Sequence, residues 1–239
     1  MTLVVASVSG SKGGTGKTVV ASLLGYYLAK ENRRKVLTID LGEMGSSTWL
    51  LLGEDPGPPY INDFFYGNAI WSEVIVESRF SQGLMVVPCS GETGPVDSTS
   101  LEYLIDRASN FFDFIILDLP AYPGTLYDPV VQLAELVIAV FNPDALSFQA
   151  VLSWTKKREF LQKKLLLPLL NKYFIFQGQW KDKLREEFGV VFTLPFDSAL
   201  LFTITQNIEE AYMNTSSNLK KSLELLAYRL QKPLLKVSG

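Results

Sequence analysis

The chain has 239 residues and a formal net charge of −3; it is 47% hydrophobic and 20% charged, with one cysteine and no histidine. This composition is typical of a globular protein with a sizeable core, and it excludes an internal disulfide, a paired-cysteine metal site and any histidine chemistry. No apolar run is long enough to span a membrane and no secretory signal is recognisable, so we expect a cytoplasmic protein.

Strands and helices are predicted to alternate along the first 140 residues. Leu3–Val8 is a short, valine-rich apolar run, as in a buried strand. A glycine-rich loop follows it, and apolar residues at helical spacing from Val19 to Leu28 predict a helix. Similar patterns predict strands at Lys35–Asp40, Leu84–Pro88, Phe112–Asp118 and Leu136–Phe141, with a helical stripe over Leu101–Ala108.

The rest of the chain continues this pattern. A long helix is predicted over Asp144–Lys163, and a sixth strand over Leu165–Leu170, where Pro168 indicates a sheet edge or a bulge. A seventh strand is predicted over Val190–Leu194. Two helices, over Ser198–Tyr212 and Thr215–Gln231, close the chain, the second with a stripe of four leucines expected to pack on the sheet.

Strands that are apolar on both faces and alternate with helices indicate one α/β domain over residues 1–239. We expect a doubly wound, mostly parallel sheet of about seven strands, with helices on both faces and no separate DNA-binding domain. Ligands of such sheets bind beyond the carboxyl ends of the strands. The glycine-rich loop, Asp40 and Asp118 all follow strands in this way.

The loop reads KGGTGKT (Lys12–Thr18) and has the chemistry of a phosphate cradle. Its backbone N–H groups and the positive end of the next helix favour an anion. Lys17 is expected to reach the β- and γ-phosphates, and the Thr18 hydroxyl to bind Mg²⁺. The strict P-loop pattern fails because Ser11 occupies its first glycine position.

The motif that does fit is the deviant Walker A motif, and the chain resembles the MinD/ParA family of P-loop ATPases. The resemblance implies that ATP and Mg²⁺ are cofactors and that Lys12 reaches across a homodimer interface to the partner's nucleotide. The implied catalytic residues are Lys12, Lys17 and Asp40. The implied nucleotide contacts in the loop are Lys12, Gly13, Gly14, Thr15, Gly16, Lys17, Thr18 and Val19.

Later segments extend the resemblance. FDFIILDLP matches the family's Walker B strand, which implies that Asp118 holds Mg²⁺ together with Thr18 and Asp40, and that Leu119–Gly124 senses the γ-phosphate. LPFD resembles the segment lining the adenine pocket, implying contacts from Pro195 and Asp197. Asn171 stands where the family often has an adenine-contacting Asn, although it could equally be an ordinary turn residue.

One position departs from the family. Its second strand ends in Asp-x-Asp, the second carboxylate positioning the attacking water, whereas here Gly42 follows Asp40 and Leu41. Phosphoryl transfer needs a positioned nucleophile, which glycine cannot supply. Three interpretations stay open: slow hydrolysis with ATP as a long-lived clamp, substitution by Glu43, or completion of the site by a partner.

The resemblance implies a switch that dimerises with Mg-ATP, hydrolyses it slowly and acts on a regulatory protein partner, DNA partition being the preferred role. Residues 151–185 carry nine basic against two acidic residues, in a chain whose first 150 residues carry eight against 17. Lys156, Lys157, Arg158, Lys163 and Lys164 are therefore candidates for non-specific DNA binding, or simply a solvated helix face. Membrane binding is not expected. The alternative is a scaffold with little or no hydrolysis, serving a secretion, motility or polysaccharide-export machine.

Overall fold

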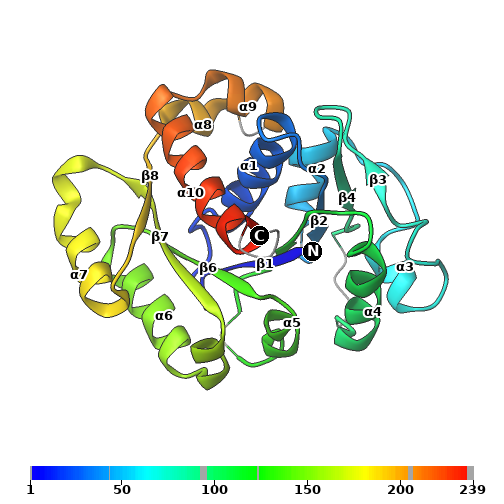
Figure 1. Cartoon of the computed structure of the whole chain (residues 1–239), viewed down its shortest axis with the longest axis horizontal. Coiled ribbons are helices and arrows are strands. Elements are labelled where there is room, and N and C mark those ends of the chain that lie inside the picture. Colours follow the sequence, from blue (N-terminus) through cyan, green and yellow to red (C-terminus); the bar gives the residue numbers. More distant parts are fainter. Residues whose placement is uncertain (1, 43, 92–95, 123, 204–206, 236–239) are drawn as a thin grey trace.

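Eight strands form one sheet in the computed structural model, which describes residues 2–42, 44–91, 96–122, 124–203 and 207–235, without the side chains of 201–203 and 232–235 (Figure 1). The strands are β1 (Leu3–Val8), β2 (Val36–Asp40), β3 (Val76–Glu77), β4 (Leu84–Val87), β5 (Phe114–Asp118), β6 (Leu136–Phe141), β7 (Leu165–Tyr173) and β8 (Phe192–Pro195). Their order is β3-β4-β2-β5-β1-β6-β7-β8, and only the β3–β4 pair is antiparallel.

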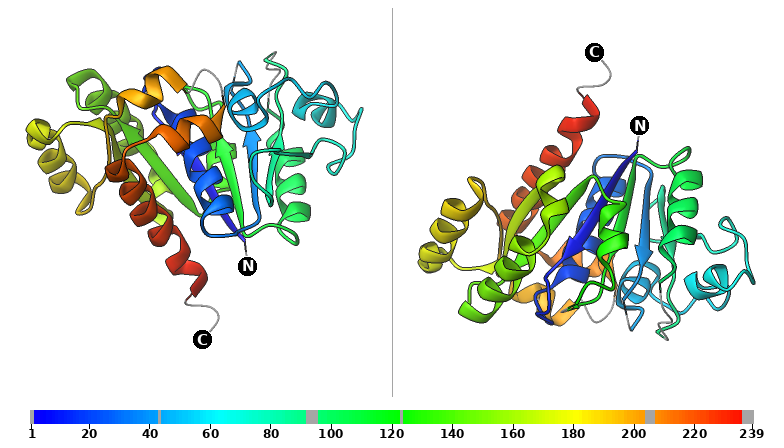
Figure 2. Two further views of the ribbon diagram at one scale, coloured as in Figure 1. Left: turned by 90° about the horizontal axis from the view of Figure 1, so that it is seen from above. Right: turned by 90° about the horizontal axis from the view of Figure 1, so that it is seen from below.

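The predicted fold class, a mostly parallel α/β sheet, is confirmed. The sheet has one strand more than expected, because β3 has only two residues and is too short to give a periodic signal. Helices cover both faces (Figure 2). One face carries α1 (Lys17–Lys30), α2 (Ser46–Leu52), α8 (Ser198–Thr203), α9 (Ile208–Asn214) and α10 (Ser217–Leu235); the other carries α3 (Ile61–Phe65), α4 (Ser98–Ala108), α5 (Asp128–Gln132), α6 (Ala145–Lys156) and α7 (Gly178–Phe188).

The core forms two apolar layers, one on each side of the sheet. Alternate residues of β1 enter different layers: Val4, Ala6 and Val8 pack with α4, α5 and α6, whereas Leu3 and Val5 pack with α1 and α10. This double burial explains the uninterrupted apolar strands. The predicted stripe of α10 is buried in the second layer, as Leu219, Leu223, Leu226 and Leu230.

Several predicted boundaries were wrong. The strand predicted to end at Leu170, with Pro168 at an edge or bulge, continues as β7 to Tyr173; it lies inside the sheet between β6 and β8, and its irregularity falls after Leu170. The long helix ends at Lys156, the chain becomes extended at Arg158, and a short 3₁₀ helix, η1 (Glu159–Lys163), follows. The predicted Ser198–Tyr212 helix is divided into α8 and α9, the latter capped by Asn207, whose side chain accepts from the Glu210 N–H. Finally, α10 continues through Pro233 to Leu235; a proline in the last turn removes only one backbone bond.

The parallel strands begin at one edge of the sheet, the amino edge, and end at the other, the carboxyl edge. At the carboxyl edge, β1, β2 and β5 end at the glycine-rich loop, Asp40 and Asp118. At the amino edge the same strands begin, and α10 extends beyond it (Figure 2). Across the described ranges, no helix is both long and apolar enough to be a membrane span.

Candidate functional site

The glycine-rich loop joins β1 to α1 at the carboxyl edge and is braced from behind by β7. Gly16 is the N-cap of α1, with φ of 90° and no side-chain cap, so the first N–H groups of the helix are left for another acceptor. A Cβ on Gly16 would lie 2.5 Å from Asn171 Nδ2. Asn171 Nδ2 donates to the Thr15 carbonyl at 2.8 Å, and Lys172 Nζ donates to the Gly14 carbonyl at 2.9 Å.

These contacts place two neighbouring side chains of β7 under the loop. The sequence predicted that Asn171 contacts adenine, and that role stays a prediction. In the structure, the amide nitrogen of Asn171 instead donates to the loop backbone. Lys172 was not singled out. The only signal for it is that it directly follows Asn171 at the end of a strand, where a side chain can reach the neighbouring loop.

Lys17 is the first residue of α1 and is only 7% exposed. Burial lowers the pKa of its ammonium group, and the nearby Asp118 opposes that effect. No carboxylate of the described residues lies within ion-pair distance of it. A buried cation at a helix N-terminus is unfavourable unless an anion joins it. The loop and Lys17 together therefore suit an anionic ligand.

Asp118, at the end of β5, lies in register with both Ser7 of β1 and Asp40 of β2. It is almost fully buried, and neither carboxylate oxygen has a hydrogen-bond partner of ordinary geometry in the described part of the chain. Burial and the Asp40 charge raise the pKa of Asp118 to about 7, although the Thr18 and Ser47 hydroxyls and Lys17 act to lower it. Two free carboxylate oxygens beside hydroxyls form the oxygen-rich environment that Mg²⁺ prefers.

Asp40 is as deeply buried but has its oxygens occupied. Oδ1 accepts from the Gly42 N–H at 2.9 Å, and Oδ2 accepts from both the N–H and the hydroxyl of Thr48 at 2.8 Å. Burial raises the pKa of Asp40, and these hydrogen bonds lower it in part. Asp40 therefore holds the first turn of α2, a contact that the sequence analysis missed; its expected role at Mg²⁺ stays a prediction.

Gly42 lies directly beside Asp40. A Cβ added to Gly42 would be 3.1 Å from Asp40 Oδ1, so a side chain here would press on that carboxylate. The Gly42 carbonyl accepts from the Cys89 thiol at 3.3 Å. Glu43, the candidate substitute for the missing carboxylate, lies outside the described residues.

The segment after Asp118 is attached to the loop and to α6. The Tyr122 N–H donates to the Gly10 carbonyl at 2.9 Å, and the Tyr122 ring meets the Trp154 ring edge-on at 5.8 Å between centroids. The Arg158 guanidinium lies over Trp154, donates to Asp128 Oδ1 at 2.6 Å and also donates to the Gly124 carbonyl. Pro123, in the same segment, lies outside the described residues.

Arg158 therefore does not belong to an exposed basic surface, contrary to the expectation for DNA binding. It is 7% exposed, paired with Asp128 of α5 and packed over Trp154 of α6. Lys156 pairs with Glu187 at 2.8 Å, and Lys164 Nζ donates to the Gln132 carbonyl. Lys157 and Lys163 have no ion pair among the described residues. Among these five residues, Arg158 is therefore buried and Lys156 is paired at the surface, whereas Lys157, Lys163 and Lys164 keep their charge without an ion pair among the described residues.

The remaining nucleotide candidates lie where β7 and β8 end. Pro195 is the last residue of β8, in register with Tyr173 of β7. Both oxygens of Asp197 are used by backbone, one by the Ala199 N–H at 3.0 Å and the other by the Ser216 N–H at 2.7 Å. The adenine contacts expected from Pro195 and Asp197 stay predictions.

Comparisons with known proteins agree with this geometry. Residues 3–172 match the family described as the AAA domain. The chain is 28% identical over 175 residues to an uncharacterized ATP-binding protein of Methanocaldococcus jannaschii, covering 72% of this chain and 65% of that one. It is 23% identical over 236 residues to the septum site-determining protein MinD of Thermotoga maritima, covering 94% and 86%.

A solved structure extends the likeness to the whole fold. The septum site-determining protein MinD of Pyrococcus horikoshii, complexed with Mg-ADP, superposes with a TM-score of 0.78 at 24% identity, covering 100% of this chain and 99% of that one. The chain spans only 52 to 65% of the length of seven of the curated relatives that it matches. The chain belongs to the AAA domain family and is a MinD/ParA-type P-loop ATPase.

Proposed function

We propose that this protein, acting as one domain over residues 1–239, is an ATP-dependent switch that binds Mg-ATP at the carboxyl edge, dimerises and hydrolyses the nucleotide slowly. The observation that carries the proposal is the unsatisfied charge at this edge. Lys17 is buried with no carboxylate of the described residues at ion-pair distance, and neither buried oxygen of Asp118 accepts a hydrogen bond of ordinary geometry from those residues. A triphosphate with a divalent cation would satisfy both.

Each side chain has a distinct part in this proposal. The N–H groups of the loop and of the first turn of α1 bind the phosphates, and Lys17 neutralises the β- and γ-phosphates. Thr18, Asp40 and Asp118 are proposed to hold Mg²⁺, and Asp40 also holds the start of α2 through Thr48. When bound, Mg²⁺ would supply positive charge that neutralises the negative charge developing as the terminal phosphoryl group leaves.

Response to the γ-phosphate is assigned to the segment that begins at Leu119. Tyr122 is hydrogen-bonded to Gly10 of the loop, and Gly124 is held by Arg158. A change of phosphate occupancy in the loop would therefore be passed to α5 and α6. This is the element expected to distinguish ATP from ADP.

Slow turnover is the part of the proposal that depends on Gly42. Without a carboxylate there, no described side chain next to Asp40 is placed to orient water, and ATP would act as a long-lived clamp. Use of Glu43, or completion of the site by a partner, are the alternatives. Lys12, partly exposed on the loop, is proposed to reach the nucleotide of a second subunit.

The proposal also concerns the molecule on which the switch acts. Control of DNA partition together with a regulatory protein is preferred, and a nucleotide-binding scaffold with little or no hydrolysis for a secretion, motility or polysaccharide-export machine is the alternative. Gly42 favours this alternative, since binding could be retained without efficient turnover.

The test measures binding, dimerisation and turnover separately. Light scattering with ATP, with ADP and without nucleotide should show a dimer only with ATP. Lys12→Ala should retain ATP binding but lose the dimer, whereas Lys157→Ala serves as a matched exposed-lysine control. A dimer that forms equally without ATP, or that survives Lys12→Ala, would refute the proposed interface. Absence of ATP binding would refute the whole proposal.

A further inference from the structure

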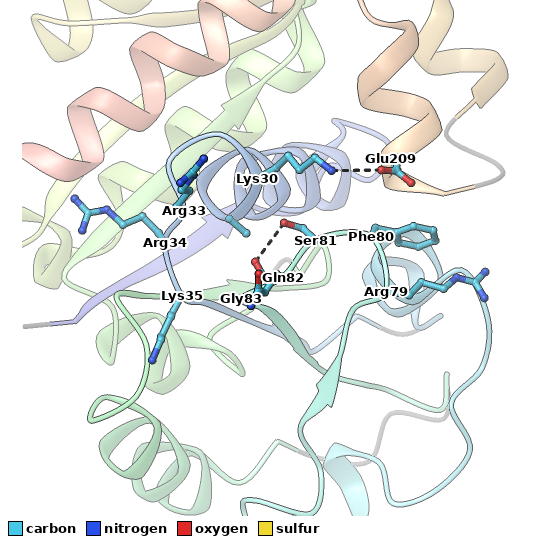
Figure 3. A pocket seen from close by; sticks show the side chains of 11 residues that line it. Lys30, Arg33, Arg34, Lys35, Arg79, Phe80, Ser81, Gln82, Gly83 and Glu209 are labelled. Carbon is cyan, nitrogen blue, oxygen red and sulfur yellow. Dashed lines mark hydrogen bonds and ion pairs between the residues drawn. The ribbon is translucent and has the colours of Figure 1, made fainter.

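The basic residues of the first 150 positions are not scattered. Only eight Lys or Arg occur there, against 17 Asp or Glu. Five of the eight line one cleft of about 710 Å³ at the amino edge, between the end of α1, the turn before β2 and the turn before β4 (Figure 3). They are Lys30, Arg33, Arg34, Lys35 and Arg79, and the one acidic residue in the lining is Glu209.

Most of this positive charge is not compensated. Lys30 lies 3.6 Å from Glu209, and Arg79 lies 3.2 Å from Glu54 at the rim. Both pairs are exposed and worth little. Arg33, Arg34 and Lys35 have no ion-pair partner in the described part of the chain. Three consecutive cations therefore face solvent with their charge unpaired, in the half of the chain that is otherwise acidic.

The arrangement of the side chains indicates what kind of anion would fit. Figure 3 shows Arg34 and Lys35 pointing away from each other and from Arg79, rather than toward one centre. A single compact anion cannot contact charges that diverge, whereas a polymer with a phosphate at every step can. The lining has no exposed large apolar side chain, since Phe80 is partly buried, so it lacks the apolar side chains with which proteins enter a membrane surface.

We propose that this amino-edge cleft binds the phosphate backbone of a nucleic acid, without reading its sequence. The proposal deepens the proposed function, and rests on it for its biological meaning, by moving the DNA-binding surface from residues 151–185 to Arg33, Arg34 and Lys35. The cleft and the nucleotide site lie at opposite edges of the sheet, so the two anions do not compete for one space.

The experiment compares two triple variants in the full chain. Arg33→Gln/Arg34→Gln/Lys35→Gln removes the unpaired cations of the cleft, and Lys156→Gln/Lys157→Gln/Lys163→Gln removes three exposed cations of the block at residues 151–185. Binding to a labelled mixed-sequence DNA duplex is followed by fluorescence anisotropy across a salt series. Since each phosphate contact contributes about −0.9 to the slope of log affinity against log salt, the cleft variant should lose about 2.7 from the slope and at least about tenfold in affinity at low salt.

The controls separate this inference from the switch itself. The cleft variant should melt like the wild type and bind ATP normally, because its three changes lie on the exposed turn before β2. The proposal would be overturned if the cleft variant bound DNA with the affinity and salt slope of the wild type. It would also be overturned if the block variant lost as much affinity as the cleft variant. So would loss of binding to phosphatidylserine vesicles, with DNA binding retained. If the proposed switch function itself were wrong, the wild-type protein would not bind ATP.

Discussion

The two ends of α1 carry the same residue type in opposite situations. Lys17 begins the helix, buried and with no carboxylate of the described residues at ion-pair distance, at the end where the helix dipole repels a cation. Lys30 ends the helix with 45% of its side chain exposed, beside Glu209, where the dipole attracts a cation. Only the first placement costs the folded protein free energy.

This difference separates two kinds of functional charge. At the carboxyl edge, a few buried charges are each unfavourable alone, so a bound ligand would relieve them and a single substitution should have a large effect. At the amino edge, each exposed cation costs the folded protein little free energy. Any anion binding there must come from several cations together, and its affinity should fall as the salt concentration rises. The predictions below test this distinction, from the largest expected effect to the smallest.

The sharpest test replaces each of the two lysines at the ends of α1 by methionine, in separate variants. Lys17→Met should weaken ATP binding by at least about 100-fold, because each lost charge-assisted hydrogen bond contributes about 1.5–3 kcal/mol. The same variant should unfold at higher urea concentration without nucleotide, since an unpaired buried charge is removed. Isothermal calorimetry and urea unfolding measure the two effects. Lys30→Met, the matched control, should change neither by more than experimental scatter.

The next test concerns the buried cation that does have a partner. Arg158→Met should lower the free energy of unfolding by about 3–5 kcal/mol, because it leaves Asp128 and the Gly124 carbonyl without their donor. Lys157→Met, one residue earlier and exposed, is the control and should be near neutral. Chemical denaturation compares them, and equal stabilities would mean that burial of Arg158 does not matter energetically.

Arg158→Lys adds a readout beyond stability. A lysine keeps the charge but cannot contact Asp128 and Gly124 together. If Arg158 positions the segment after Asp118, this variant should fold yet lose part of the preference for ATP over ADP. An unchanged ratio of the two affinities would limit Arg158 to a structural role.

A third test uses pH at Asp118. Its pKa of about 7 in the folded chain exceeds its unfolded value of 3.8, so the folded state holds the proton over this range and stability is lost as pH rises through it. Without Mg²⁺ and nucleotide, Asp118→Asn should therefore be more stable than the wild type at pH 8, by about 2–4 kcal/mol. The difference should shrink as pH falls toward 5. Urea midpoints at both pH values measure it, and a pH-independent difference would contradict the burial argument.

Much of the carboxyl edge could be predicted from sequence because its signals are local. Leu3–Val8 and Leu136–Phe141 have the predicted bounds, and the loop after β1 is a contiguous motif. Local patterns do not reveal which distant segment touches that motif. The contacts of Asn171 and Lys172 with the loop, 156 and 158 residues away in sequence, depend on β7 lying beside β6 and on the bulge that precedes Tyr173.

Charge counts misled for the same reason. The block from residue 151 to 185 is basic by count, but in the fold Arg158 is buried over Trp154 and paired with Asp128, and α7 brings Glu187 to Lys156. Conversely, the amino-edge cleft joins Arg33, Arg34 and Lys35 to Arg79, and no window of sequence contains them all. Exposure and pairing are properties of the fold, so a count of basic residues cannot supply them.

The smallest expected effect concerns Gly42, where the carboxyl edge lacks a charge that its family has. Gly42→Asp restores the implied carboxylate, and a well-placed one contributes about 10²–10⁴-fold to turnover. Here its Cβ would lie 3.1 Å from Asp40 Oδ1, next to a carboxylate that is already buried. Repulsion between the two charges and the shift needed to relieve it should absorb most of the gain, so we expect about a tenfold rise in ATP hydrolysis.

Two companion variants decide what that rise means. Gly42→Asn has nearly the same shape without the charge; if positioning of water by a carboxylate is the cause, it should stay at the slow wild-type rate. Glu43→Ala should also leave that rate unchanged if the wild type truly lacks a water-orienting group. A brisk wild-type rate that Glu43→Ala abolishes would instead show that the neighbouring carboxylate performs this role. ATP would then be an ordinary substrate rather than a clamp, and a second acidic group at position 42 should slow the enzyme instead of accelerating it.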